Sequence, residues 1–336
     1  MLAWQAHGRR IVQISYSPDG RRLATFDSGG TDVAVWTTPG GNREQVIRAA
    51  GDSANAVAFS PDGSQLAVAF VGEIVVHDLA SGRVAARWTL IDQFVRSLTF
   101  GPDGSTLLAA GVGPTAVGWL WDARDGTLRH ELRKQPFVES GWACLADGRT
   151  VLWTDDPILE RSLRYCALSD VVTGNRLTAL TPSDRTKAVS VAAAAPRVAI
   201  ASEESVAVWD LSGLSTPHRP RSAWRDVHRR LIGLPAGGGA ANLNPMVRLL
   251  PPDEWFNLAA LDRTGRRALT VSDDWRVSLW NVPRARRFFG AQETSTPVAT
   301  WDWQIDQICA IAFASDGLTA AAGSDTGRVV IWDLDA

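Results

Sequence analysis

A hairpin pattern recurs along the chain and restricts its fold more than any other feature. Three close copies read ISYSPDGRRLATF from Ile14, VAFSPDGSQLAVAF from Val57 and LTFGPDGSTLLAA from Leu98. In each, two apolar runs flank a turn in which Pro presets φ, Asp hydrogen-bonds its own backbone and Gly accepts a positive φ. This pattern predicts a β-hairpin. Looser copies begin at Cys144, Ala193, Leu258 and Ile311.

A third apolar run follows each hairpin and commonly ends in Trp-Asp, as in VAVWDL (206–211) and VVIWDL (329–334). The runs recur every 40 to 52 residues, apart from one interval of 71. They are apolar on both alternations, which is typical of strands buried on both faces. The Trp position of the seven runs is occupied by Trp36, His77, Trp121, Ser169, Trp209, Trp280 and Trp332.

Short strands with a period near 40 to 45 residues and a Trp-Asp ending resemble the WD-repeat (WD40) β-propeller family over the whole chain. The resemblance implies an all-β fold, a single seven-bladed β-propeller of four-stranded antiparallel blades. Such blades bury their faces only by stacking on one another. The turns rich in Ser-Pro-Asp-Gly and the bias toward Arg resemble bacterial members of the family.

The stretch MLAWQAH (1–7) resembles the fourth strand of a blade, because Trp4 precedes His7 by the offset usual for that strand. The last unit stops after its third strand. We therefore expect the N-terminal strand to pair with the C-terminal blade, which closes the ring, removes both sheet edges and makes the chain a complete unit. The expected parts of the single domain 1–336 are the fourth strand of blade 7 (1–6), blade 1 (about 7–48), blade 2 (49–90), blade 3 (91–134), blade 4 (135–181), blade 5 (182–226), an inserted loop (227–253), blade 6 (254–303) and blade 7 (304–336).

In many family members a His, a Ser or Thr, an Asp and the Trp form a buried hydrogen-bonded set in each blade. Here the His position is filled only by His7, and Gly30 stands at the Asp position of the same unit. Asp274 fills the Asp position of unit six, which has no His. We therefore expect few or no complete sets, and blades held mainly by apolar packing.

Composition narrows the classes of function. Apolar residues make up 45% and charged residues 21%, as in soluble globular proteins, and the net charge is −2. The sequence has no apolar run of about 20 residues for a membrane span and no secretory signal. Its three cysteines are widely spaced, which indicates reduced thiols and a cytoplasmic location. Nucleic acid and membranes are therefore disfavoured as partners, and a monomer is expected.

Catalytic patterns are missing from the sequence. The five histidines are scattered without metal-binding spacing, and there is no GxSxG elbow, phosphate loop or dinucleotide fingerprint. We expect a non-catalytic protein without cofactor or metal. The alternative is a propeller-fold enzyme, hydrolase- or lactonase-like, whose site is gathered in the central channel.

In the resembled family one rim of the disc grips the partner, which implies a protein-interaction scaffold for a protein or peptide. Aromatic and Arg side chains on that rim would suit a binding hot spot. The competing interpretations are that Phe94 and Trp255 belong to the core and that Arg10 and Arg96 are merely solvated. The implied rim positions are Arg10, Ser53, Asn55, Phe70, Phe94, Arg96, Trp255, Asn257, Asp273, Gln307 and Asp325.

Two inserts offer further surfaces. Residues 226–254 combine apolar side chains with Arg229, Arg230 and Arg248, and residues 283–296 place Arg286 and Arg287 beside two phenylalanines. The first insert is expected on the binding rim, and the second on the opposite rim. Their arginines keep open a nucleic-acid- or phosphate-binding module as another alternative.

Overall fold

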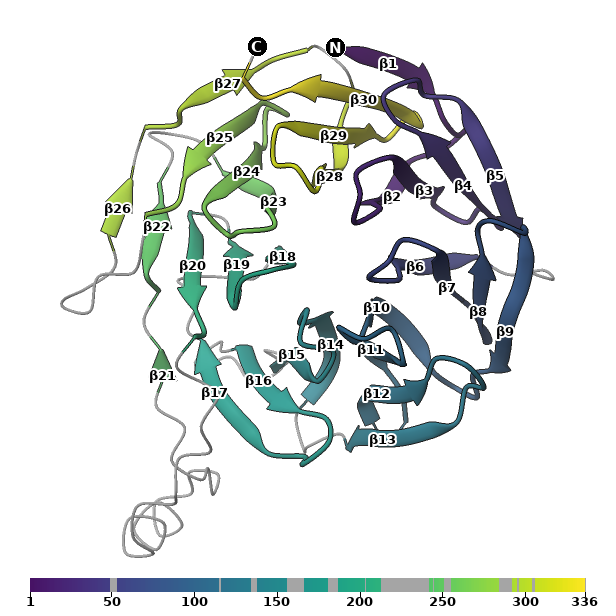
Figure 1. Cartoon of the computed structure of the whole chain (residues 1–336). Helices are drawn as coiled ribbons and strands as arrows, with labels where there is room; N and C mark the ends of the chain where they lie inside the picture. Colours follow the sequence, from purple (N-terminus) through teal and green to yellow (C-terminus); the bar gives the residue numbers. More distant parts are fainter. Residues whose placement is uncertain are drawn as a thin grey trace, which may run out of the picture.

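Seven β-sheets are arranged in a ring (Figure 1). The computed structural model describes residues 1–48, 53–114, 116–133, 138–155, 166–180, 187–202, 204–212, 242–243, 245–250, 255–283, 292–294, 296–303 and 306–335. In these ranges all regular structure is β-strand, and no helix is present that could cross a membrane. The architecture is therefore the all-β, seven-bladed propeller that the repeat predicted.

Blades 1 to 3 are each formed by four consecutive strands, with the first strand innermost (Figure 1). Blade 1 contains β2 (Ile11–Tyr16), β3 (Arg22–Asp27), β4 (Asp32–Thr37) and β5 (Arg43–Arg48). Blade 2 contains β6 (Ala54–Phe59), β7 (Gln65–Phe70), β8 (Glu73–Asp78) and β9 (Arg83–Thr89). Blade 3 contains β10 (Phe94–Phe100), β11 (Thr106–Val112), β12 (Ala116–Asp122) and β13 (Leu128–Arg133).

Blades 4 and 5 each carry an additional outer strand that runs parallel to the fourth. Blade 4 contains β14 (Val138–Cys144), β15 (Thr150–Asp155), β16 (Cys166–Asp170), β17 (Arg176–Leu180) and the added β21 (Asn242–Leu243). Blade 5 contains β18 (Ala188–Val191), β19 (Arg197–Ala201), β20 (Val206–Asp210), β22 (Val247–Leu249) and the added β26 (Gln292–Thr294).

Blades 6 and 7 complete the ring. Blade 6 contains β23 (Phe256–Leu261), β24 (Arg267–Ser272), β25 (Val277–Asn281) and β27 (Ala299–Trp301). Blade 7 contains β28 (Ile308–Phe313), β29 (Thr319–Ser324), β30 (Arg328–Asp333) and, as its fourth strand, β1 (Leu2–Gln5) from the other end of the chain.

The fourth strand of blade 5 differs from our expectation. We assigned residues 182–226 to this blade and 227–253 to a loop, but β22 pairs with β20 through Val206↔Leu249. Val247 and Leu249 are buried on either side of the half-buried Arg248, which is the alternation of a strand. The described end of the insert therefore completes the blade, and Arg248 is a strand residue instead of a loop residue.

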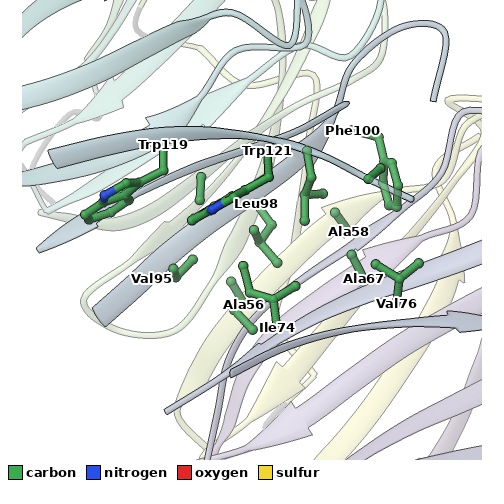
Figure 2. Packing of buried hydrophobic residues seen from close by; sticks show 14 of the residues in the cluster. Ala56, Ala58, Ala67, Ile74, Val76, Val95, Leu98, Phe100, Trp119 and Trp121 are labelled. Atoms are coloured by element: carbon green, nitrogen blue, oxygen red, sulfur yellow. The ribbon is translucent and has the colours of Figure 1, made fainter. Parts of the chain in front are cut away.

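Apolar side chains fill the spaces between neighbouring blades. Between blades 2 and 3, Ala56 and Ile74 face Val95 and Leu98 in one buried cluster (Figure 2). Small residues of blade 2, such as Ala56, leave room for the large Trp119 and Trp121 of blade 3, which belong to the same cluster. Each large side chain buried in this way contributes about 1.5–3 kcal/mol. Apolar packing therefore supplies most of the cohesion between blades.

The turns between first and second strands also touch from blade to blade. A Cβ on Gly148 would lie only 2.5 Å from the Cα of Gly101, so this contact requires glycine. Blade 5 lacks the Ser-Pro-Asp-Gly turn and uses Arg197 instead. The Arg197 Nη1 donates to the carbonyl of Gly265 in blade 6 at 2.6 Å, and Arg197 also pairs with Asp210 at 3.5 Å. A buried arginine thus replaces turn packing at this joint.

The ring is closed by its two ends. β1 pairs antiparallel with β30 in the register Leu2↔Ile331 to Gln5↔Arg328, and both chain ends lie at blade 7 (Figure 1). The Trp4 ring lies 5.6 Å from that of Trp36 and packs on the core between blades 7 and 1. This confirms the predicted pairing of the N-terminal strand with the C-terminal blade.

Blade 1 holds three members of the hydrogen-bonded set. The Trp36 Nε1 donates to the Thr25 hydroxyl at 2.8 Å, and the same hydroxyl shares a 2.8 Å hydrogen bond with the His7 ring. Burial lowers the pKa of His7, so the imidazole is neutral at neutral pH. In blade 6 the Trp280 Nε1 donates to Thr270 at 2.8 Å without a histidine. Thr25 therefore satisfies two buried groups at once.

Replacing Thr25 by valine should destabilise the fold, because it leaves the Trp36 N–H and the His7 ring without their partner. We expect a loss of about 2 kcal/mol or more in the free energy of unfolding, measured in urea. Thr25→Ser keeps the hydroxyl and is the matched control, with an expected loss below about 1 kcal/mol. Equal losses in the two variants would show that the hydrogen bonds contribute nothing.

Candidate functional site

One face of the disc collects most of the predicted rim residues. Because consecutive strands of a blade alternate in direction, the links into the first strands and the turns between second and third strands lie on the same face. We call this face the first-strand rim, and the face with the turns between first and second strands the hairpin rim. The inner side of the ring is formed by the first strands β2, β6, β10, β14, β18, β23 and β28 (Figure 1).

A β-bulge recurs near the start of the first strands. The register shifts between Ile11 and Gln13 in β2, and equivalent shifts occur in β6, β10, β23 and β28. A bulge leaves one residue out of the ladder and redirects its side chain. The bulged residues are Val12, Asn55, Arg96, Asn257 and Cys309, so three predicted rim residues occupy equivalent places around the channel mouth.

The predicted rim residues differ in exposure. Trp255 is 57% exposed and Phe94 is 43% exposed, so neither belongs to the core. The other exposed members are Arg10, Arg96, Asp273 and Gln307, and the half-buried members are Ser53, Asn55, Asn257 and Asp325.

Phe70 was wrongly assigned to the binding surface. It is fully buried in the cluster between blades 1 and 2, beside Phe26 and Val75. Phe70 is the last residue of β7 and pairs with Glu73 across the turn to β8, so its side chain still follows the buried alternation of the strand. Its position next to the turn predicted a place on the rim, but the strand continues to this residue.

The Trp255 ring faces a cation of its own chain. The Lys187 Nζ lies 5.7 Å from the ring centroid, within the range of a cation–π interaction. The Trp255 carbonyl accepts a hydrogen bond from the Asp273 backbone at 2.8 Å, which fixes the residue to the neighbouring turn. The aromatic side chain is thus held by its backbone while its surface remains accessible.

Cys309 is the bulged residue of β28 on the first-strand rim. Its Sγ donates to the carbonyl of Gln307 at 3.3 Å. Partial burial raises the pKa of the thiol, although Arg10 nearby acts in the opposite direction. A reactive cysteine needs a lowered pKa. Among the described residues, no group of three His, Cys, Asp or Glu side chains is placed to hold a metal ion.

The remaining predicted residues lie elsewhere. Arg229, Arg230, Arg286 and Arg287 fall outside the described residues. The Trp positions lie in third strands, where Trp36, Trp121, Trp209, Trp280 and Trp332 are buried. His77 replaces Trp in blade 2 and is half-buried, and burial lowers its pKa. These side chains lie in the interior of the blades, away from the first-strand rim.

Comparison with known proteins agrees with this architecture. Residues 295–333 match the family model "WD domain, G-beta repeat". The crystal structure of the Cps50 (Swd1) β-propeller domain from Myceliophteria thermophila superposes with a TM-score of 0.72 at 13% sequence identity, covering 98% of each chain. No curated protein sequence matches the chain. The match and the shared fold support the WD40 resemblance, but a fold found in so many proteins does not specify a function.

A matched pair of phenylalanines tests the division between core and rim. Phe70→Ala removes a fully buried ring and should lower the free energy of unfolding by about 3–5 kcal/mol. Phe94→Ala removes a partly exposed ring, with an expected loss below about 1 kcal/mol. Both are measured by urea unfolding. A large loss in Phe94→Ala, equal to that of Phe70→Ala, would place Phe94 in the core.

Proposed function

We propose that this chain is a WD40-type propeller that acts as a non-catalytic interaction scaffold and binds a protein or peptide on the first-strand rim. The observation that carries the proposal is the exposure of Trp255, Phe94, Arg10 and Arg96 on a single face. Aromatic and Arg side chains are the residues that dominate binding energy at interfaces. They bury much area with few rotatable bonds or form several hydrogen bonds.

The scaffold holds these side chains without relying on them for its own stability. Each one projects from the start of a first strand whose neighbours are buried, such as Val95 next to Phe94 and Phe256 next to Trp255. A rigid frame reduces the ordering cost of binding. This supports a preformed binding surface in preference to a surface that is assembled on contact.

The proposed location, source, oligomeric state and class of partner rest on the types of side chain present. Three free thiols are consistent with a cytoplasmic location, and the sequence style is consistent with a bacterial source. A monomer is proposed because the outer strands carry charged side chains, as in β13 (LRHELR). The nucleic-acid alternative is not favoured, since acidic Asp273 and Asp325 share the rim with the arginines.

Partner capture from the native host tests the proposal. The double variant Trp255→Ala, Arg96→Ala should lose the captured protein, while the free energy of unfolding changes by less than about 1 kcal/mol. The matched control is Val84→Ala, Arg21→Ala, which removes an exposed apolar side chain and an exposed arginine away from the first-strand rim. Capture that survives in the first variant, or is lost equally in both, would contradict rim binding.

A further inference from the structure

Three exposed arginines stand on the first-strand rim of blades 1 to 3. Arg9, Arg10 and Arg96 are exposed in the links and first strands of blades 1 and 3. Within the described part of the chain, no carboxylate lies within salt-bridge distance of these three side chains. Asp32 and Glu73 of these blades are paired, with Arg48 at 3.2 Å and Arg87 at 3.5 Å, whereas Asp27 and Asp92 form no ion pair among the described residues. We call the rim of blades 1 to 3 the basic sector.

Next to Arg96 lies a hydrogen-bond donor without an acceptor. The Asn55 Nδ2 is buried and has no partner in the described structure. Asn55 and Arg96 are the bulged residues of β6 and β10, which pack against each other, so their side chains emerge side by side. A buried donor without an acceptor destabilises the structure, and an acceptor from a ligand would remove that cost. The Arg96 guanidinium and the Asn55 amide donor suit a carboxylate, whereas the Arg10 side chain lies beside Cys309 of blade 7.

Three large apolar side chains are exposed beside these donors. The Leu90 N–H donates to the Gly72 carbonyl at 2.8 Å, which places Ile91 opposite Val71. Asp92 then turns the chain with a left-handed φ of 53°, and Phe94 follows at the start of β10. Ile91 is 75% exposed, Phe94 43% and Val71 42%. An apolar cluster of this kind on a soluble protein indicates a contact surface.

A second unsatisfied polar group lies in the same chain segment as Ile91 and Phe94. The Gln93 Oε1 is buried without a hydrogen-bond partner among the described residues, and Gln93 stands between Ile91 and Phe94. It is an acceptor, whereas Asn55 offers a donor. An extended peptide backbone presents both N–H and C=O groups, so it can satisfy the two amides together. A simple anion could satisfy only Asn55.

Blades 6 and 7, of which blade 7 packs on blade 1, carry carboxylates on the same rim. Asp273 and Asp306 are exposed on blades 6 and 7, and the half-buried Asp325 has a carboxylate oxygen without a hydrogen-bond partner in the described structure. Arg276 on this side is paired with Asp274 at 3.1 Å. An acidic ligand is therefore repelled from blades 6 and 7 and attracted to blades 1 to 3.

We infer that the basic sector binds an extended acidic peptide. Its carboxylate would be held by Asn55 and Arg96, and its neighbouring apolar side chains would contact Val71, Ile91 and Phe94. This inference rests on the proposed function and adds the chemistry of the partner and the part of the rim that is used.

The test is a selection from a random-sequence peptide library displayed on phage, with the full chain immobilised. We expect enrichment of peptides with Asp or Glu next to large apolar residues. The best peptide is then synthesised with a fluorescent label, and its Kd is measured by anisotropy. Exchanging its acid for the amide should raise Kd about tenfold or more, and the effect should shrink at high ionic strength.

Variants of the protein locate the site. Asn55→Asp keeps the shape of the side chain but replaces the donor by an acceptor, and should raise Kd about tenfold or more. Arg96→Ala should do the same. The control Arg21→Ala, Arg83→Ala removes two exposed arginines of the hairpin rim and should leave Kd unchanged. Thermal unfolding of each variant verifies that it is folded.

Other results would overturn the inference and show what fails. Enrichment of basic peptides whose binding depends on Trp255 and Asp273 would refute the basic sector but leave rim binding intact. Tight, Arg96-dependent binding of an oligothymidylate probe, with no acidic peptide enriched, would identify a nucleic-acid site instead. If no peptide is enriched, the inference fails, and the capture experiment on the host partner decides the proposed function separately.

Discussion

A four-stranded blade of this protein cannot bury its two faces by itself, and every other property of the structure depends on the contact between blade faces. The cores lie between sheets: one cluster joins blades 2 and 3, and another joins blades 7 and 1. Since each blade needs two neighbours, the ring must close. The pairing of β1 with β30 closes it and places Trp4 against Trp36 at the joint.

This arrangement separates stability from binding. Strand centres are buried between blades, whereas strand starts at the channel mouth are released from the ladder by bulges. Side chains there can vary without disturbing the core. The contrast between the buried Phe70 and the exposed Phe94 illustrates the division, because the two lie on neighbouring blades near the same rim. The proposed scaffold function and the basic sector both follow from it.

Much of the fold could be predicted from local patterns. The Ser-Pro-Asp-Gly turns and the doubly apolar third strands identify the blades, and the orphan strand around Trp4 predicts the closure. The fourth strand of blade 5 could not be found, because β22 has only three residues and follows a long insert. The joint made by Arg197 was also missed, since its partner Gly265 is far away in sequence.

The candidate site was predicted less completely. Equivalent positions in the repeat correctly brought Asn55, Arg96 and Asn257 to one rim, but a bulge depends on strand pairing and leaves no mark in a single sequence. The apolar partners Val71 and Ile91 were missed for the same reason, because only the pairing of Leu90 with Gly72 brings them together. Phe70 was misplaced because the exact end of a strand decides the direction of its side chain.

Native-state hydrogen exchange of the backbone amides in β1 and β30 tests ring closure most directly. If the closure is as described, the amides of β1 that bond to β30 are protected, and β1 and β30 lose protection together when urea is added. Exchange of β1 at the rate of an unstructured peptide, with β30 still protected, would contradict the account.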